Sequence, residues 1–244
     1  MRPFTPLLTR LCVPAVVAAA SAGLPAMAYA AEATSTDSPS AQASAERPHQ
    51  PWVFRCVLDR RARTVVAALS DDVWAAWDAQ TCDLYKVWPG EAAGEGKGGM
   101  KFTGTVYDTR HGPQPQTLGE TFDTFASSSW TVLLDGEPVE VTPRWLGHSV
   151  DGDKSVTLGR ELKLAGGSTV TVYETPEAAG PRSLRRTFRV DGLPAGMTLR
   201  NQLANGDVAQ AEAEGGTVVE ESRGQRVLLL EMTSDGEAVT TVTW

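Results

Sequence analysis

Beyond residue 50, apolar and polar residues alternate in short runs that are separated by turn residues. Along 169–174 the two valines share one face while the threonines and Tyr173 share the other, as in a half-buried strand. Runs at 130–134 and 139–142 flank Asp135-Gly136, a dipeptide that tolerates the positive φ angles of a type I′ hairpin turn. Many short strands without long helical periodicity predict an all-β fold, an antiparallel β-sandwich or barrel. We expect the sandwich, with a large two-sheet super-sandwich as a variant.

Further strands are predicted at 52–58, 64–69, 84–88, 100–107, 145–150, 156–164, 184–190, 197–203, 227–231 and 239–244. Residues 73–78, VWAAWD, fit two descriptions. Ser70 could cap a short helix that carries Val73, Trp74 and Trp77 on one face. The short spacing and the aromatic content favour a strand, and the helix is the alternative.

The first thirty residues have the three parts of a secretory signal peptide. Arg2 and Arg10 supply positive charge, 11–22 is apolar, and Ala28-Tyr29-Ala30 is a small-residue cleavage site. Residues 31–50 are rich in Ala, Ser, Thr, Glu and Pro, which predicts a disordered linker. The β-sandwich domain is therefore expected over 51–244, with a subdivision near 117–129 as an alternative. The location is expected to be periplasmic or secreted.

The net charge of the chain makes some classes of binding partner unfavourable. The chain of 244 residues has a formal net charge of −8, which argues against nucleic acid and against an anionic membrane surface. The leader's apolar run is shorter than the ~18 residues that a membrane helix needs, so no integral span is expected in the mature chain.

Two cysteines, Cys56 and Cys82, remain once the leader is removed. In an oxidising compartment they could form a disulfide, and two buried free thiols are the alternative. No CxxC or CxxCH motif occurs, so covalent haem attachment is not expected.

A cluster of aromatic residues supplies the first candidate binding site. Trp74, Tyr85 and Trp88 could stack against sugar rings, whose C–H faces are apolar while their rims are polar. On a strand Trp74 and Trp77 point to opposite faces, so one of them is expected in the core. The alternative is that all of these aromatic residues belong to the core.

The segment YDTRHGPQPQ, 107–116, supplies the second candidate. Asp108, Arg110, His111 and Gln114 could hydrogen-bond sugar hydroxyls or orient a protein partner, on a backbone stiffened by two prolines. The alternative is a rigid structural turn.

The stretch 51–90, with KFTGTVYDTRHGPQPQ at 101–116, resembles a β-rich module of large exported bacterial proteins. WLGHSVDGDKSVTLGRELKL and SLRRTFRVDGLPAG are similar to the second part of that module. Such proteins often also carry a c-type cytochrome domain or a sugar-dehydrogenase-like propeller. The resemblance implies an accessory module of a periplasmic cytochrome or sugar-oxidising system, although the haem motif and the propeller are missing here.

Catalysis would need an acid and a base within reach of each other. His111 or His148 with Glu174 would suit a mutarotase-like sugar epimerase, by analogy with other sandwiches. No GxSxG motif, P-loop or calcium-loop spacing is present. No catalytic residue, metal or cofactor is therefore predicted. The favoured function is an exported, non-catalytic module that binds carbohydrate or an exported protein partner.

Overall fold

Strands form nearly all of the chain that the structure describes. The computed structural model describes residues 43–45, 50–90, 100–102, 115, 117, 122–123, 130–152, 154–205, 209–222 and 226–244. Among these residues every regular element is a strand, and the strand pairs are antiparallel. The predicted all-β antiparallel sandwich is confirmed.

One layer is a six-stranded sheet with the order β10-β11-β12-β13-β18-β15. Its strands are β10 (Val141–Val150), β11 (Val156–Leu164), β12 (Thr169–Gly180), β13 (Ser183–Asp191), β15 (Gln210–Glu214) and β18 (Gly236–Thr243). Strict alternation along β12 and β13 gives this sheet a buried inner face and a solvent-facing outer face.

Two five-stranded sheets form the other layer. The N-terminal sheet contains β2 (Trp52–Leu58), β3 (Arg61–Ala68), β4 (Val73–Asp78), β5 (Asp83–Pro89) and β7 (Phe122–Asp123), in that order. The β14 sheet has the order β16 (Thr217–Ser222), β17 (Arg226–Met232), β14 (Met197–Asn205), β8 (Trp130–Leu134) and β9 (Glu137–Val139). A separate short pair joins β1 (Ala43–Ala45) to β6 (Met100–Phe102).

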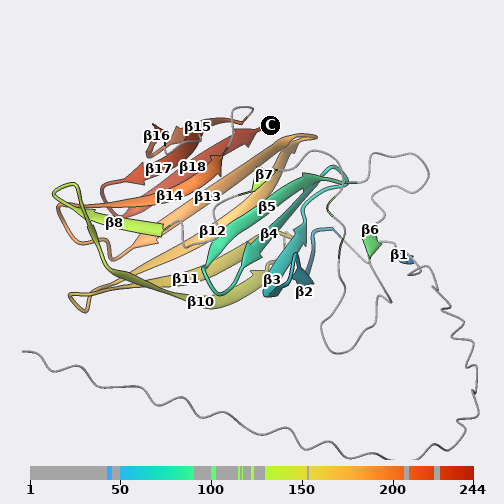
Figure 1. Ribbon diagram of the computed structural model, residues 1–244, viewed down its shortest axis with the longest axis horizontal. Coiled ribbons are helices and arrows are strands. Elements are labelled where there is room, and N and C mark those ends of the chain that lie inside the picture. Colours follow the sequence, from blue (N-terminus) through green and yellow to red (C-terminus); the bar gives the residue numbers. More distant parts are fainter. Residues whose placement is uncertain are drawn as a thin grey trace, which may run out of the picture. The chain divides into compact units, whose positions relative to one another are not determined.

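Both five-stranded sheets pack on the inner face of the six-stranded sheet (Figure 1). Glu174 and Phe188 are paired on that face, and they contact Trp77 of the N-terminal sheet and Trp130 of the β14 sheet respectively. One continuous hydrophobic core contains residues from all three sheets. The core therefore lies between the two layers, as expected for a sandwich.

Residues 73–78 form strand β4, so the alternative of a short helix is wrong. Val73, Ala75 and Trp77 enter the main core, while Trp74 and Ala76 enter a second cluster on the opposite face of the N-terminal sheet. Both faces of β4 are buried, which explains why the segment shows no alternation of apolar and polar residues.

Two hairpin turns have a left-handed backbone, and the sequence had predicted it for one of them, Asp135-Gly136. Asp135 and Gly136 have φ values of 53° and 84°, and Asp59 and Arg60 have φ values of 48° and 68°. These values fit type I′ turns, whose twist matches that of the flanking strands.

Residues 38–244 cluster as one compact unit. The predicted signal peptide, 1–30, and most of the predicted linker, 31–50, lie outside the described residues, as does most of 117–129. Three residues of that linker form β1. Within the described chain no helix has the length and hydropathy to cross a membrane.

Gly215 lies where the chain passes from β15 of one layer to β16 of the other. Its φ is +73°, and a Cβ there would lie 2.2 Å from the carbonyl oxygen of Glu237. Gly136 also has a positive φ, but no heavy atom lies within 4 Å of its Cβ position. A substitution at Gly136 would therefore cause backbone strain alone, whereas one at Gly215 would cause backbone strain and a steric clash.

We expect Gly136→Ala to lower the free energy of unfolding by about 1–2 kcal/mol, the cost of left-handed backbone for a residue with a Cβ. Gly215→Ala should lower it by roughly 1–3 kcal/mol more, because the methyl group also meets backbone. Urea denaturation of both variants measures the difference. Equal losses would show that the crossing turn moves away from Glu237 at little cost.

Candidate functional site

The carboxylate of Glu174 lies in the core between the two layers and is completely buried. Its Oε1 accepts hydrogen bonds from Nε of Arg186 at 2.7 Å and from Nε1 of Trp77 at 3.0 Å. Its Oε2 accepts a hydrogen bond from Nη2 of Arg160. Both arginine side chains are also fully buried. We call these three charged residues the Glu174 cluster.

Strand register explains how the cluster forms. Glu174 on β12 pairs with Leu158 on β11 and with Phe188 on β13. Arg160 and Arg186 lie two residues from those partners, so each occupies a diagonal position on the same face as Glu174. Neighbouring strands thus deliver both guanidinium groups to one carboxylate.

The cluster also joins the three sheets through a backbone carbonyl. The oxygen of Cys82, in the turn between β4 and β5, accepts hydrogen bonds from Nη1 of Arg160 at 2.9 Å and from Nε1 of Trp130 at 3.0 Å. Arg160 belongs to the six-stranded sheet, Cys82 to the N-terminal sheet and Trp130 to the β14 sheet. The carbonyl oxygen of Cys82 is therefore a place where residues of all three sheets are joined by hydrogen bonds.

Burial by itself would raise the pKa of Glu174, but the charges and hydrogen bonds of Arg186 and Arg160 outweigh it and hold the pKa at about 2. The three groups therefore carry one net positive charge at neutral pH. Nε of Arg160 and both Nη atoms of Arg186 have no hydrogen-bond partner within the described part of the chain. A cation–π contact partly replaces the missing hydrogen-bond partners of Arg186, because its guanidinium lies 4.6 Å from the ring centroid of Phe188.

These observations do not suit Glu174 as a catalytic base. A base has to reach the proton that it removes and has to accept it near the working pH. Glu174 is buried, ionised and fully paired with donors. His148 lies on β10, opposite Leu158, and is exposed, two strands away from Glu174. His111 lies outside the described residues.

The three aromatic residues of the predicted site lie on one face of the N-terminal sheet, and Trp77 lies on the other. Trp74, Tyr85 and Trp88 share one face of the N-terminal sheet, with Trp52 and Phe54 beside them. Trp77 points to the other face and enters the main core. We call the first set the aromatic face. The separation of Trp74 from Trp77 was predictable from strand geometry alone.

Trp74 and Trp88 nevertheless differ from the expectation of rings that are open to a ligand. They are 2% and 3% exposed, and their ring centroids lie 6.3 Å apart in a stacked arrangement. Trp52, Phe54 and Tyr85 are only half-buried. The accessible aromatic surface therefore belongs to these three residues, of which the sequence had indicated only Tyr85.

Charged residues surround Tyr85. Its hydroxyl donates to Oδ2 of Asp59 at 2.9 Å, and Lys86 Nζ donates to the same oxygen at 2.6 Å. The guanidinium of Arg61 lies 4.2 Å from the ring centroid and forms an ion pair with Asp78 at 2.6 Å. Burial and the hydrogen bond to Asp59 raise the pKa of Tyr85 above its ordinary value, so the phenol stays neutral.

The disulfide prediction is corrected, because Cys56 and Cys82 are both free, buried thiols. Cys56 packs in the hydrophobic cluster of the aromatic face, while Sγ of Cys82 is directed to the carbonyl oxygen of Ala79 in its own turn. Burial raises the pKa of Cys56 to about 12 and that of Cys82 to about 11. Thiols with such pKa values remain protonated and oxidise slowly.

The second predicted site lies outside the described residues, since Asp108, Arg110, His111 and Gln114 all fall in that part of the chain. Its role stays a prediction. Within the described residues no group of His, Cys, Asp and Glu side chains is arranged to hold a metal ion.

Sequence reasoning had considered Glu174 only as a base and had not placed Arg160 or Arg186 in a site. The sequence did contain a signal that both arginines are buried. Arg160 stands between Leu158 and Leu162 in the apolar phase of β11, and Arg186 stands in the same phase of β13. A charge at an inward position of an alternating strand has to find a buried partner.

No protein-family model and no curated protein matches this chain. Solved structures with partial similarity include a mutant heparan sulfate lyase from Pedobacter heparinus, 11% identical with a TM-score of 0.31, over 71% of this chain and 35% of that one. A heparinase III gene product is 16% identical with a TM-score of 0.34, over 83% and 36% of the two chains. Its form with methylated lysines is 14% identical with a TM-score of 0.32, over 80% and 34%.

This chain thus spans about a third of the length of those proteins. Similarity at these TM-scores carries no functional argument, so the function has to be inferred from the residues of this chain. The sequence resemblance to a cytochrome-associated module stays a prediction.

We expect Glu174→Gln to lower the free energy of unfolding by about 3–5 kcal/mol, because it leaves two buried guanidinium groups without a counter-charge. Glu161→Gln is the matched control. Glu161 pairs with Arg144 at 2.6 Å, but the side chain of Arg144 is 67% exposed, so the loss should be only about 0–1 kcal/mol. Urea denaturation compares the two variants. Similar losses would show that the Glu174 cluster is not the main electrostatic constraint on the fold.

Acid should weaken this contribution. The pKa of Glu174 is about 2 in the folded protein, below its ordinary value of 4.5. A carboxylate with a lowered folded-state pKa stabilises the fold fully above the unfolded pKa and loses that effect as the pH falls toward the folded one. The difference in unfolding free energy between wild type and Glu174→Gln should be constant above about pH 5 and should shrink from about pH 4.5 to 2. Urea titrations at a series of pH values test this. A difference that stays constant down to pH 2 would contradict it.

Proposed function

We propose that this chain is an exported, non-catalytic β-sandwich module that binds carbohydrate through the aromatic face of its N-terminal sheet. The observation that supports this most directly is the composition of that face. Its inner layer is the stacked pair Trp74 and Trp88, and its accessible layer is Trp52, Phe54 and Tyr85. Export rests on the predicted leader.

The arrangement of the aromatic face follows from register. Trp52, Trp74 and Trp88 occupy one row across the sheet, with Ala68 between the first two. Phe54 lies two residues along β2 from Trp52, and their ring centroids are 4.6 Å apart. A row of large rings across a sheet offers apolar surface that can stack against the C–H faces of sugars.

Polar groups stand where the hydroxyl rim of a sugar would need them. Asp59, Arg61 and Lys86 surround Tyr85 and offer both donors and acceptors at the edge of the aromatic surface. Lys86 forms an ion pair with Asp59, and Arg61 forms one with Asp78. These ion pairs hold the polar groups in position before a ligand binds, which lowers the entropy cost of binding. An apolar platform with a few fixed polar groups is typical of small-molecule and sugar sites.

The non-catalytic part of the proposal rests on the Glu174 cluster. The one carboxylate that the sequence suggested as a base is buried, ionised and bound by donors from both sides. It supports the layers, and the aromatic face lies on the opposite side of the N-terminal sheet from it.

Tyr85→Ala tests the aromatic face, and Tyr173→Ala is its matched control. Both tyrosines are half-buried, and each has an arginine close to its ring, at 4.2 Å for Arg61 and 4.5 Å for Arg189. Tyr173 lies on the outer face of the six-stranded sheet. The two variants therefore remove the same group from different surfaces.

We expect tryptophan fluorescence of the mature protein to shift saturably with at least one polysaccharide of a neutral and acidic panel. Tyr85→Ala should weaken that binding about tenfold, as the loss of an anchoring aromatic does, and Tyr173→Ala by less than about twofold. A flat response to the whole panel would end the carbohydrate proposal and would favour a protein partner. Equal losses in both variants would remove the aromatic face as the binding surface.

A further inference from the structure

A second surface of different character involves β2 and β10, which are edge strands of different sheets. Arg55 of β2 is exposed, and within the described residues it has no ion-pair partner. It pairs in register with Val65, which pairs with Trp77, so Arg55 points to the inner side of the N-terminal sheet. That side faces the six-stranded sheet and not the aromatic face.

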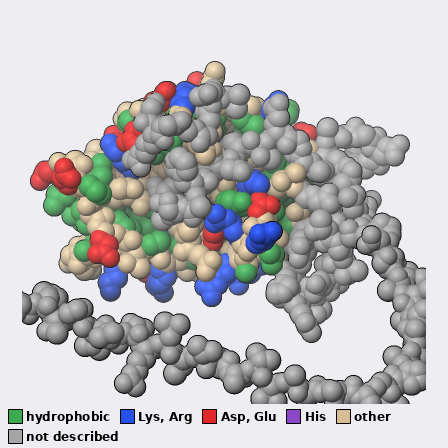
Figure 2. Space-filling model, in the orientation of Figure 1, with side chains coloured by type: hydrophobic (Ala, Val, Ile, Leu, Met, Phe, Trp, Pro, Cys, Tyr) green, Lys and Arg blue, Asp and Glu red, His purple; other side chains and the backbone are tan. Residues whose placement is uncertain are grey.

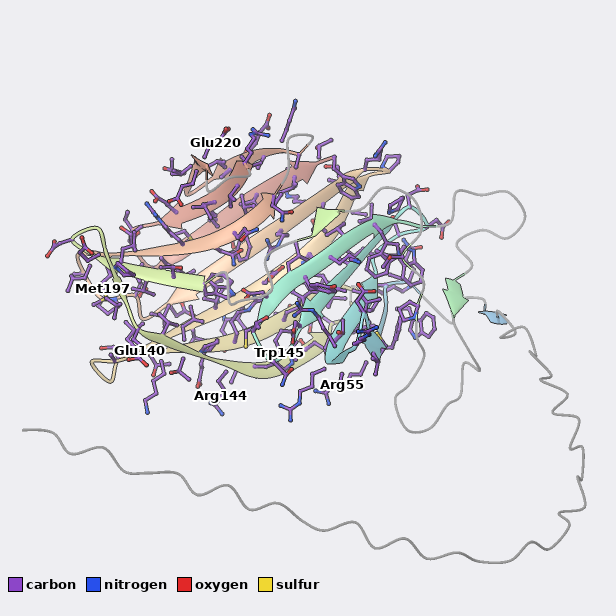
Figure 3. All side chains as sticks on the ribbon, viewed as in Figure 1. Arg55, Glu140, Arg144, Trp145, Met197 and Glu220 are labelled. Carbon is purple, nitrogen blue, oxygen red and sulfur yellow. The ribbon has the colours of Figure 1, made fainter. Side chains whose placement is uncertain are left out.

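Two residues of β10, His148 and Trp145, lie on the inner face of the six-stranded sheet, since they pair in register with the buried residues Leu158 and Arg160. Partial burial lowers the pKa of His148 below 6.5, and the positive charge of Arg55 lowers it further, so the two groups are close enough to interact. Trp145 pairs in register with Arg160, and a bulge separates it from Gly147. Figure 3 shows Arg55 from β2 and Trp145 from β10 next to each other in this view. We call Arg55, Trp145 and His148 the β2–β10 rim.

Positive charge also lies behind the rim. The indole of Trp145 packs against the main core, and the guanidinium of Arg160 lies 5.9 Å from its ring centroid. Arg160 belongs to the Glu174 cluster, whose two arginines outnumber its one carboxylate. The half-buried ring of Trp145 therefore has a buried cation close to it.

The local charge contrasts with that of the whole chain, which is −8. Figure 2 shows Lys and Arg side chains spaced along the lower edge, where β10 runs in Figure 1. An acidic protein repels polyanions in general. An exposed arginine without an ion-pair partner in the described part of the chain, with a half-buried indole on β10, is therefore a selective feature.

We propose that the β2–β10 rim binds the anionic group of an acidic polysaccharide, a carboxylate or a sulfate ester, with the adjoining sugar ring stacked on Trp145. This rests on the proposal that the chain binds carbohydrate, but it uses a surface separate from the aromatic face and names the class of sugar. Arg55 supplies a planar guanidinium that matches either oxyanion in a bidentate manner. His148 is neutral at pH 7 and supplies a hydrogen bond. Trp145 supplies the apolar surface for the ring.

Arg55→Gln tests the rim, and Arg185→Gln is its matched control. Arg185 lies on the outer face of β13, is exposed, and has no ion pair within the described residues. Both variants remove one positive charge from the surface, so general electrostatic effects should be equal. Only Arg55 belongs to the rim.

Affinities of the mature protein for polygalacturonate, dextran sulfate and neutral dextran are measured by biolayer interferometry at a fixed low salt concentration. We expect Arg55→Gln to weaken binding of at least one acidic polymer about tenfold, as the loss of a charge-assisted hydrogen bond does. Arg185→Gln should change it by less than about twofold. Loss for polygalacturonate alone identifies a carboxylate, and loss for dextran sulfate alone identifies a sulfate ester.

Equal weakening by both arginine variants would overturn the rim, because it would show unspecific attraction. Binding of neutral dextran as tight as that of the acidic polymers would overturn the acidic class. Tyr85→Ala in the same experiment separates the two proposals. Binding that is lost in Tyr85→Ala and kept in Arg55→Gln supports the aromatic face and rejects the rim. The reverse pattern supports the rim and rejects the aromatic face.

Discussion

The carboxylate of Glu174 is the point through which the two layers of this sandwich are held in one arrangement. It is ionised in the core, and two buried guanidinium groups and an indole donate to it. Burying a carboxylate is costly unless charges and hydrogen bonds compensate it, and here the compensation comes from three different strands. Arg160 extends the network to the Cys82 carbonyl, where Trp130 also donates. An intact cluster of this kind adds less net stability than its number of contacts suggests, but its disruption is expensive. Its contacts join residues of all three sheets at one place in the core.

That constraint decides which surfaces remain for binding. The inner faces of all three sheets are used by the main core, so a ligand has to approach an outer face or a rim. The N-terminal sheet is unusual because its other face also carries a hydrophobic cluster. The β2–β10 rim is the second surface that remains for binding. Its half-buried Trp145 lies close to Arg160 of the Glu174 cluster. The two surfaces differ in chemistry. One is aromatic with balanced ion pairs, and the other is basic with a single indole.

Much of the local structure could be read from the pattern of residues. Asp135-Gly136 predicted its hairpin correctly, and the alternation in β12 predicted which residues face the core. The opposite orientation of Trp74 and Trp77 also followed from strand geometry. Burial was harder. Trp74 and Trp88 were candidates for an open site and are 2% and 3% exposed, because contact between distant segments determines exposure. The expected disulfide is absent for a similar reason, since Cys56 and Cys82 have different neighbours once the strands are paired.

The sequence by itself determined the class of fold, because alternation and turn residues act over a few neighbouring positions and leave a record in the chain. The alternation along β11, β12 and β13 also marks Arg160, Glu174 and Arg186 as charges at inward positions, although the prediction had considered only Glu174, and only as a base. Only the tertiary structure decided that these three residues meet, since they lie on separate strands and only the pairing of β11, β12 and β13 places them diagonally. The same holds for Arg55 and His148, which interact although they belong to edge strands of different sheets. Contacts between sheets depend on how whole faces pack, and no short stretch of sequence carries that information.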